Sequence, residues 1–330
     1  MRMKVKILLI LQFLVIIGLS VLVFSLSSPK IDPEAHYRNS NYSLLSSRIS
    51  YDILQPNNYL ILNYDPLEKE LSALIKENHL NVSIYVENIR DGASFGVNSE
   101  QTYLTGSMGK LPVAILIMKQ IERGNFTLHT NFTVLDTDKD SYSGTLYAEN
   151  ATEASVSFLL EAMLQNSDNT ALHVLERHTN PSDYITLLEQ YYGYYDGTLP
   201  TETTPNVINP LTVYTIYSSL FLSTILSADH SEYLLEILSN TTFPIHELAD
   251  IPENITITQK YGTRYDGDNK YFHDCGIIYA HETRVFYCVM TKDLDPDTAS
   301  EIIGILVNKV YSYTVEQRKI LDEYETNLPS

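Results

Sequence analysis

A serine and a lysine three residues apart, Ser107 and Lys110, have the types and spacing needed for nucleophilic catalysis. A serine hydroxyl is a poor nucleophile at its ordinary pKa and needs a base within hydrogen-bond reach. If Ser107 opens a helix, Lys110 lies one turn further on the same face, and its amine can return to the hydroxyl. The apolar run 111–118 that follows predicts a buried central helix. Burial and a second cation, Lys260, are expected to lower the pKa of Lys110 and supply a neutral amine.

Two further polar segments occur downstream, Ser167-Asp168-Asn169 and Lys260-Tyr261-Gly262. The first lies between two helical patterns, at 156–164 and 170–175, and therefore at a turn between helices. The second ends the alternating stretch 254–259, which predicts a strand. Gly262 would allow a substrate backbone to approach that strand closely. Taken alone, the Ser-Asp-Asn segment is better explained as a helix N-cap than as a catalytic motif.

In this order and spacing, the three segments resemble the S-x-x-K, S-D-N and K-T-G motifs of the class A β-lactamase-like family, within the penicillin-recognising serine hydrolases. The resemblance implies a β-lactamase/transpeptidase-like α+β fold, in which helices flank an antiparallel sheet and a mostly helical subdomain is inserted in mid-chain. The order of the predicted helices and strands agrees with this layout. The implied reaction opens a C–N bond of a β-lactam or a related amide through an acyl-Ser107 intermediate, without a cofactor. No cluster of His, Cys, Asp and Glu has the spacing of a zinc site.

The resemblance also implies roles for individual residues. Ser167 would pass a proton to the leaving nitrogen, and Asn169 would hold the substrate amide. The backbone N–H groups of Ser107 and Thr263 would form the oxyanion hole. The family usually has Thr at the position of Tyr261, so a hydroxyl expected to hold the substrate carboxylate is missing unless Thr263 or the Tyr261 phenol replaces it.

Deacylation in this family uses a glutamate in a loop between the second and third motifs. Glu202 lies 35 residues after Ser167 and has Asn206 four residues on, which resembles the family pattern. Pro210 begins a predicted helix soon afterwards, so the loop is shorter than usual. The alternative is that Glu202 is an ordinary solvated loop charge.

The only two cysteines fall on two strands, 272–279 and 283–291, which resemble the strands that follow the lysine strand in this family. A hairpin centred on the turn His281-Glu282 places Cys275 opposite Cys288, close enough for a disulfide. The alternative is two buried free thiols that pack as small apolar residues.

The N-terminus decides the compartment in which such a disulfide could form. Three basic residues precede an uncharged run of 22 residues, 7–28, which is long enough to span a membrane. We expect residues 1–28 to form an uncleaved signal anchor, 29–64 a stalk or loosely packed arm, and 65–330 the hydrolase domain on the extracytoplasmic side. A cleaved signal peptide would have a shorter core and a small-residue cleavage site.

A net charge of −19 argues against a nucleic-acid partner, whose phosphates require a basic face. The expected partners are a β-lactam or a cell-wall peptide-like substrate, and the membrane through the N-terminal helix. Two alternatives to a β-lactamase remain open: a D-alanyl-D-alanine peptidase or penicillin-binding protein, and a non-catalytic binding module that keeps the fold.

Overall fold

An antiparallel sheet of five strands, in the order β2-β1-β9-β8-β7, is the centre of the fold. Its strands come from both ends of the chain: β1 (Val82–Asn88), β2 (Ser94–Val97), β7 (Thr256–Asp266), β8 (Asn269–Ala280) and β9 (Thr283–Lys292). The computed structural model describes residues 62–180, 182–183, 186–187, 207–280 and 283–326. The N-terminal strands pair with the C-terminal ones through β1 and β9, so the sheet closes only when both ends of the chain meet.

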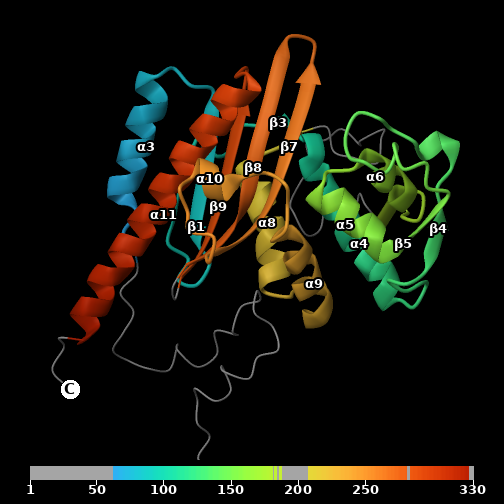
Figure 1. Cartoon of the computed structure of the whole chain (residues 1–330). Coiled ribbons are helices and arrows are strands. Elements are labelled where there is room, and N and C mark those ends of the chain that lie inside the picture. Colours follow the sequence, from blue (N-terminus) through green and yellow to red (C-terminus); the bar gives the residue numbers. More distant parts are fainter. Residues whose placement is uncertain (1–61, 181, 184–185, 188–206, 281–282, 327–330) are drawn as a thin grey trace, which may run out of the picture. The chain divides into compact units, whose positions relative to one another are not determined.

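One face of the sheet is covered by α3 (Asp65–Glu77), α10 (Ile245–Leu248) and the long helix α11 (Pro296–Thr326). In Figure 1, α3 and α11 lie side by side on this face. Helix α3 buries Leu67, Leu71 and Ile75, which are four residues apart and so form one apolar stripe. These side chains pack against alternate residues of the strands, such as Ile84 and Val289.

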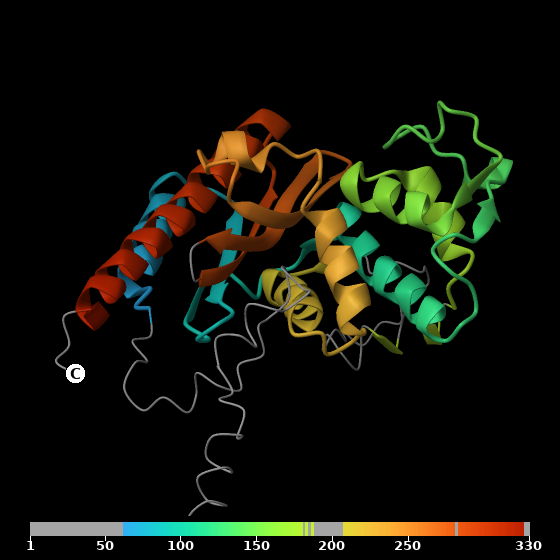
Figure 2. The same cartoon turned by 60° about the horizontal axis from the view of Figure 1, so that its bottom comes forward.

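The middle of the chain supplies five helices of a second core cluster: the last two pack on the other face of the sheet, and the first three pack on one another beside it (Figure 2). They are α4 (Lys110–Glu122), α5 (Val156–Gln165), α6 (Asn169–Glu176), α8 (Pro210–Phe221) and α9 (Ala228–Leu238). Every residue from Lys110 to Met118 is buried, which confirms the prediction of a buried central helix. The predicted α+β layout, with a helical part between the N-terminal and C-terminal strands, is therefore confirmed.

Short elements connect these layers. They are β3 (Tyr103–Leu104) paired with β6 (Val207–Ile208), β4 (Asn131–Thr133) paired with β5 (Glu153–Ser155), and the 3-10 turns η2 (Gly106–Gly109) and η3 (Asp136–Asp138).

Two local predictions need correction. Ser107 lies in the 3-10 turn η2 rather than in the first turn of the α-helix, which begins at Lys110. Lys260 lies in the middle of β7 and not at its end, because the strand continues through the polar residues up to Asp266. Their side chains alternate without an apolar period, so the sequence pattern alone gave no sign of this extension.

In the part of the chain that the structure describes, no helix is long and apolar enough to cross a membrane. The predicted anchor, 1–28, and the stalk, 29–64, fall outside the described residues except for the last three positions of the stalk.

Candidate active site

The amine of Lys110 is the centre of the candidate site. Its Nζ lies 3.0 Å from the Oγ of Ser107 and 3.2 Å from the Oγ of Ser167. It also donates to the backbone oxygen of Ser167 at 2.8 Å and to Oδ1 of Asn169 at 2.7 Å. The structure thus brings the first two predicted motifs together around one nitrogen.

The surroundings of Lys110 favour its neutral form. Burial lowers the pKa of Lys110 from 10.5 to about 8, although the carboxylates of Asp168, Asp140 and Glu176 act in the opposite direction. Ser107 is only half-buried, whereas Lys110 is 2% exposed. A lysine with this pKa is about one-tenth neutral at pH 7, and a general base requires this neutral form.

The Ser-Asp-Asn segment occupies the sharp turn between α5 and α6. Ser167 has a φ of +56°, which is uncommon for a residue with a side chain. Asp168 is the N-cap of α6, and its carboxylate accepts from the backbone N–H of Ala171 at 2.9 Å. Asp168 therefore caps the helix, as the N-cap alternative predicts, while the side chains of Ser167 and Asn169 contact the amine of Lys110.

Sequence reasoning missed a loop, 140–146, that holds this turn in place. The hydroxyl of Ser143 donates to the backbone oxygen of Ser167 at 2.8 Å, and the backbone oxygen of Ser143 accepts from the backbone N–H of Asn169 at 3.0 Å. Leu146 donates its backbone N–H to Asp168 at 2.8 Å. Gly144, with a φ of +91°, passes so close that a Cβ there would lie 2.0 Å from Oδ2 of Asp168. A glycine at this position allows the close approach, but nothing in the local sequence pattern indicates it.

Strand β7 lies directly against the turn that carries Ser107. A Cβ on Gly262 would be 3.1 Å from the backbone nitrogens of both Ser107 and Met108. A Cβ on Gly106, whose φ is +51°, would be 2.8 Å from the backbone oxygen of Thr263. The absence of side chains at Gly106 and Gly262 thus lets the backbones of the nucleophile turn and of β7 approach each other, with Thr263 against the residue before Ser107.

Lys260 is fully buried on β7, on the strand face that the alternation shares with Gly262. Burial lowers its pKa well below the ordinary value, the charge of Lys110 lowers it further, and the carboxylate of Asp274 raises it. In the described part of the chain its Nζ donates to the backbone oxygen of Tyr261 at 3.0 Å. A buried lysine whose pKa is lowered by burial and by a neighbouring cation is typical of functional sites.

Residues on the other face of the sheet support this strand. Asp274 accepts a 2.6 Å hydrogen bond from the phenol of Tyr287, and burial raises the pKa of Asp274 to about 7. The ring of Tyr261 packs against Phe243 at 5.6 Å between centroids, and its phenol lies 3.4 Å from the hydroxyl of Thr242. The phenol of Tyr261 is thus engaged with the segment before α10.

His273 is opposite Gly262 in the strand register and is fully buried. Its Nε2 donates to the backbone oxygen of Leu104 at 2.9 Å, three residues before Ser107. Burial lowers the pKa of His273 to about 4, so the ring is neutral at physiological pH. This contact fixes the segment that leads to the nucleophile, and the structure gives no contact between His273 and Ser107.

The predicted disulfide is present. Cys275 and Cys288 are directly opposite each other on β8 and β9 and are joined, with a Cα–Cα distance of 4.0 Å. Cys275 is also the register partner of Lys260. The disulfide therefore joins β8, which pairs with the Lys260 strand β7, to β9.

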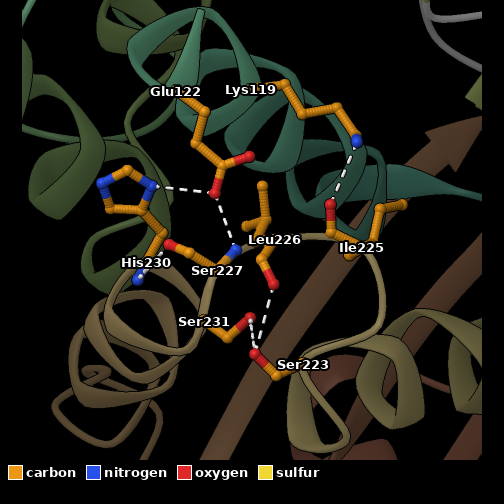
Figure 3. A network of polar contacts seen from close by, with 8 residues as sticks. All are labelled: Lys119, Glu122, Ser223, Ile225, Leu226, Ser227, His230 and Ser231. Carbon is orange, nitrogen blue, oxygen red and sulfur yellow. Dashed lines mark hydrogen bonds and ion pairs between the residues drawn. The ribbon is translucent and has the colours of Figure 1, made fainter.

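The far end of α4 is held by a separate polar network (Figure 3). Glu122 accepts from the backbone N–H of Ser227 at 2.7 Å and contacts Nδ1 of His230 at 3.0 Å. Lys119 donates to the backbone oxygen of Ile225 at 3.0 Å. These contacts attach the end of the helix that begins at Lys110 to the connection between α8 and α9.

One predicted site residue is left without a structural description. Glu202 lies outside the described residues. Within the described ranges, no group of three or more His, Cys, Asp or Glu residues could hold a metal ion.

Comparison with known proteins identifies the family. The model of the Beta-lactamase enzyme family matches residues 66–314. The chain therefore belongs to the Beta-lactamase enzyme family. It is 23% identical over 270 residues to the β-lactamase CTX-M-97 of Escherichia coli, covering 78% of this chain and 91% of that protein. It is also 23% identical over 224 residues to a β-lactamase of Proteus vulgaris, covering 64% of this chain and 82% of the relative.

Solved structures show the same fold. PBP-A superposes with a TM-score of 0.65 at 21% identity, over 76% of this chain and 97% of the other. The extended-spectrum β-lactamase TLA-3 superposes with a TM-score of 0.66 at 19% identity, over 77% of this chain and all of the other. The β-lactamase/transpeptidase-like fold expected from the three motifs is confirmed.

Proposed function

We propose that this protein is a serine hydrolase that opens a β-lactam or a related amide through an ester with Ser107. The observation that carries the proposal is that one buried amine, that of Lys110, lies within hydrogen-bond reach of both Ser107 and Ser167. The close approach of β7 to the Ser107 turn supports it, because the backbone N–H groups of Ser107 and Thr263 can then stabilise one oxyanion.

The hydrogen-bond pattern suggests how Lys110 acts as the base. A neutral amine has two N–H groups and one lone pair. The backbone oxygen of Ser167 and Oδ1 of Asn169 can only accept, so they take the two N–H groups at 2.8 and 2.7 Å. The lone pair is then left for a hydroxyl proton, and the Oγ of Ser107 is 3.0 Å away.

Acylation would proceed in two balanced proton transfers. The Ser107 oxygen attacks the carbonyl carbon as its proton moves to Lys110, and a tetrahedral oxyanion forms. When the C–N bond breaks, the leaving nitrogen takes a proton through the hydroxyl of Ser167, which recovers one from Lys110. Burial favours the neutral form of both Lys110 and Lys260. A neutral Lys260 places no second positive charge beside Lys110 while Lys110 takes up the Ser107 proton.

Release of the acyl group needs an activated water, for which we propose Glu202. Its spacing from Ser167 and its i+4 Asn206 support this assignment. If Glu202 does not act there, the protein is a penicillin-binding or D-alanyl-D-alanine peptidase-like hydrolase. The position of Tyr261 favours the third candidate, a non-catalytic binding module, because its phenol lies 3.4 Å from the hydroxyl of Thr242 instead of supplying the missing threonine hydroxyl.

We propose further that the domain from residue 65 onward acts outside the cytoplasm, attached through 1–28. The basic residues before the apolar run, and a disulfide between the only two cysteines, support this location.

Mass spectrometry of the purified ectodomain after exposure to benzylpenicillin tests the reaction. We expect a mass increase equal to one penicillin, located on the peptide that contains Ser107, and its loss in Ser107→Ala. Labelling that persists in the alanine variant, or maps to another residue, refutes the assignment.

A further inference from the structure

One row of residues crosses four strands of the sheet on the face that meets the nucleophile turn. It consists of register partners on β7, β8, β9 and β1: Gly262, His273, Met290 and Ser83. Cross-strand partners in an antiparallel sheet point to the same face. A Cβ on Gly262 would be 3.1 Å from the backbone nitrogen of Ser107, so the side chain of His273 also projects toward the nucleophile turn.

The short strand β3, which leads into that turn, is attached to this row at two points. Nε2 of His273 donates to the backbone oxygen of Leu104 at 2.9 Å, and the ring of His273 lies edge-to-face against Tyr103 with 5.5 Å between centroids. The second attachment is a 2.7 Å hydrogen bond between the hydroxyls of Tyr103 and Ser83. His273 therefore holds the backbone of β3, whereas Ser83 holds only a side chain.

His273 is linked to both segments that carry the proposed oxyanion-hole donors. Its side chain holds Leu104, three residues before Ser107. Its backbone pairs with Gly262, directly before Thr263. The N–H groups of Ser107 and Thr263 can stabilise one oxygen only if both point at it, so the offset between η2 and β7 matters. His273 is fully buried, so water does not compete for its hydrogen bond.

The close approach of the two backbones does not by itself set this offset. The turn η2 and strand β7 meet across Gly106 and Gly262, where van der Waals contact limits how close they come without fixing a direction. A hydrogen bond does have a preferred direction. We propose that His273 is a positioning residue that fixes the Ser107 and Thr263 halves of the oxyanion hole relative to each other. The inference rests on the proposed function, from which it takes the role of these two N–H groups.

The proposal predicts which kinetic constant changes. An oxyanion hole acts when negative charge develops on the carbonyl oxygen, after the substrate has bound. Loss of the His273 contact should therefore lower the first-order acylation rate constant about 10- to 100-fold, and leave the dissociation constant of the preceding noncovalent complex unchanged. A boronic acid that forms a tetrahedral adduct with Ser107 places an oxygen in the hole, so its affinity should fall together with the rate constant.

Two amide variants test this with nearly the same chemistry. His273→Gln places its amide nitrogen close to the position of Nε2 and can donate to Leu104, so we expect an acylation rate constant within about threefold of that of the unmodified protein. His273→Asn carries the same amide on a side chain one methylene shorter, does not reach Leu104 and should show the full loss. His273→Phe keeps the aromatic contact with Tyr103 but has no donor. It should show the same loss and gives a second test that does not bury an unpaired amide.

Tyr103→Phe is the matched control, because it removes the second attachment of β3 and leaves the first. Its acylation rate constant should equal that of the unmodified protein. Urea unfolding of every variant shows how much stability each has lost, so that a slow but folded variant is recognised.

Single-turnover labelling over a range of concentrations of a fluorescent penicillin gives both constants. A rate constant and a boronate affinity that fall together in His273→Asn and His273→Phe, but not in His273→Gln or Tyr103→Phe, support the inference. It is wrong if the glutamine and asparagine variants acylate equally, if the loss lies in the dissociation constant, or if Tyr103→Phe is slowed as much. These three results leave the proposed function intact. An unmodified protein that is not acylated at Ser107 refutes the proposed function, and the inference with it.

Discussion

The rate of acylation should rise with pH through the titration of Lys110. Burial lowers the pKa of this residue to about 8, and the base must be neutral to accept the Ser107 proton. With that pKa, about one-tenth of the amine is neutral at pH 7 and about nine-tenths at pH 9. The second-order rate constant for acylation should therefore increase about tenfold between these values and reach a plateau above pH 9.

The structure also indicates how the midpoint can be moved. The carboxylate of Asp140 favours the charged form of Lys110, after the stronger effect of Asp168. Asp140→Asn keeps an oxygen able to accept from Nδ2 of Asn169, which lies 3.3 Å away, but removes the charge. The midpoint of the profile should move to lower pH in this variant.

The assay is quenched-flow labelling by a fluorescent penicillin, measured from pH 6 to pH 10 at constant ionic strength. Lys119→Gln is the control, because Lys119 is on the same helix but bonds to Ile225 at its far end. That variant should keep the original midpoint. A rate that stays flat between pH 6.5 and pH 9 refutes Lys110 as the base, and an unmoved midpoint in Asp140→Asn refutes the electrostatic account.

Three further predictions concern deacylation, the turn at Ser167 and the disulfide. Glu202→Gln should leave acylation nearly unchanged while the acyl-enzyme accumulates in intact-mass spectra; free turnover by this variant shows that Glu202 is an ordinary loop charge. Gly144→Ala should slow acylation about 10- to 100-fold because its Cβ would overlap Asp168. The control is Gly124→Ala, which has a similar φ of +76° but nothing within 4 Å of its Cβ, and so should lower stability without slowing acylation. Equal acylation rates in both variants would contradict this reason. Replacing both cysteines by alanine should lower the free energy of unfolding in urea by up to about 3 kcal/mol, since the bond closes a loop with a sequence separation of 13; an unchanged midpoint and slope show that the bond contributes nothing.

Local sequence patterns predicted the parts of the site that depend on spacing along the chain. The i, i+3 relation of Ser107 and Lys110 needs only one helical turn. The opposition of Cys275 and Cys288 needs only a hairpin whose register is set by its turn. Both relations are short-range, and both appear in the structure.

Contacts between segments far apart in the chain could not be predicted in this way. The loop 140–146 reads as a polar loop, and only its contact with Asp168 shows why position 144 is a glycine. The side chain of Tyr261 was a candidate for binding the substrate carboxylate, but its direction depends on Phe243, eighteen residues earlier. The resemblance to a family supplied the remaining roles, which the residue types alone did not fix.

The distribution of burial around the nucleophile connects the fold to the proposed chemistry. A base with a low pKa must be kept from water, whereas a nucleophile must be reached by its substrate. The structure meets both needs within one helical turn, because Lys110 begins a helix that is buried through Met118, and Ser107 remains half-buried in the 3-10 turn before it. If Ser107 lay one turn further into the helix, it would be buried with the base. The short 3-10 turn is therefore the element that keeps the nucleophile accessible to substrate while the base is buried.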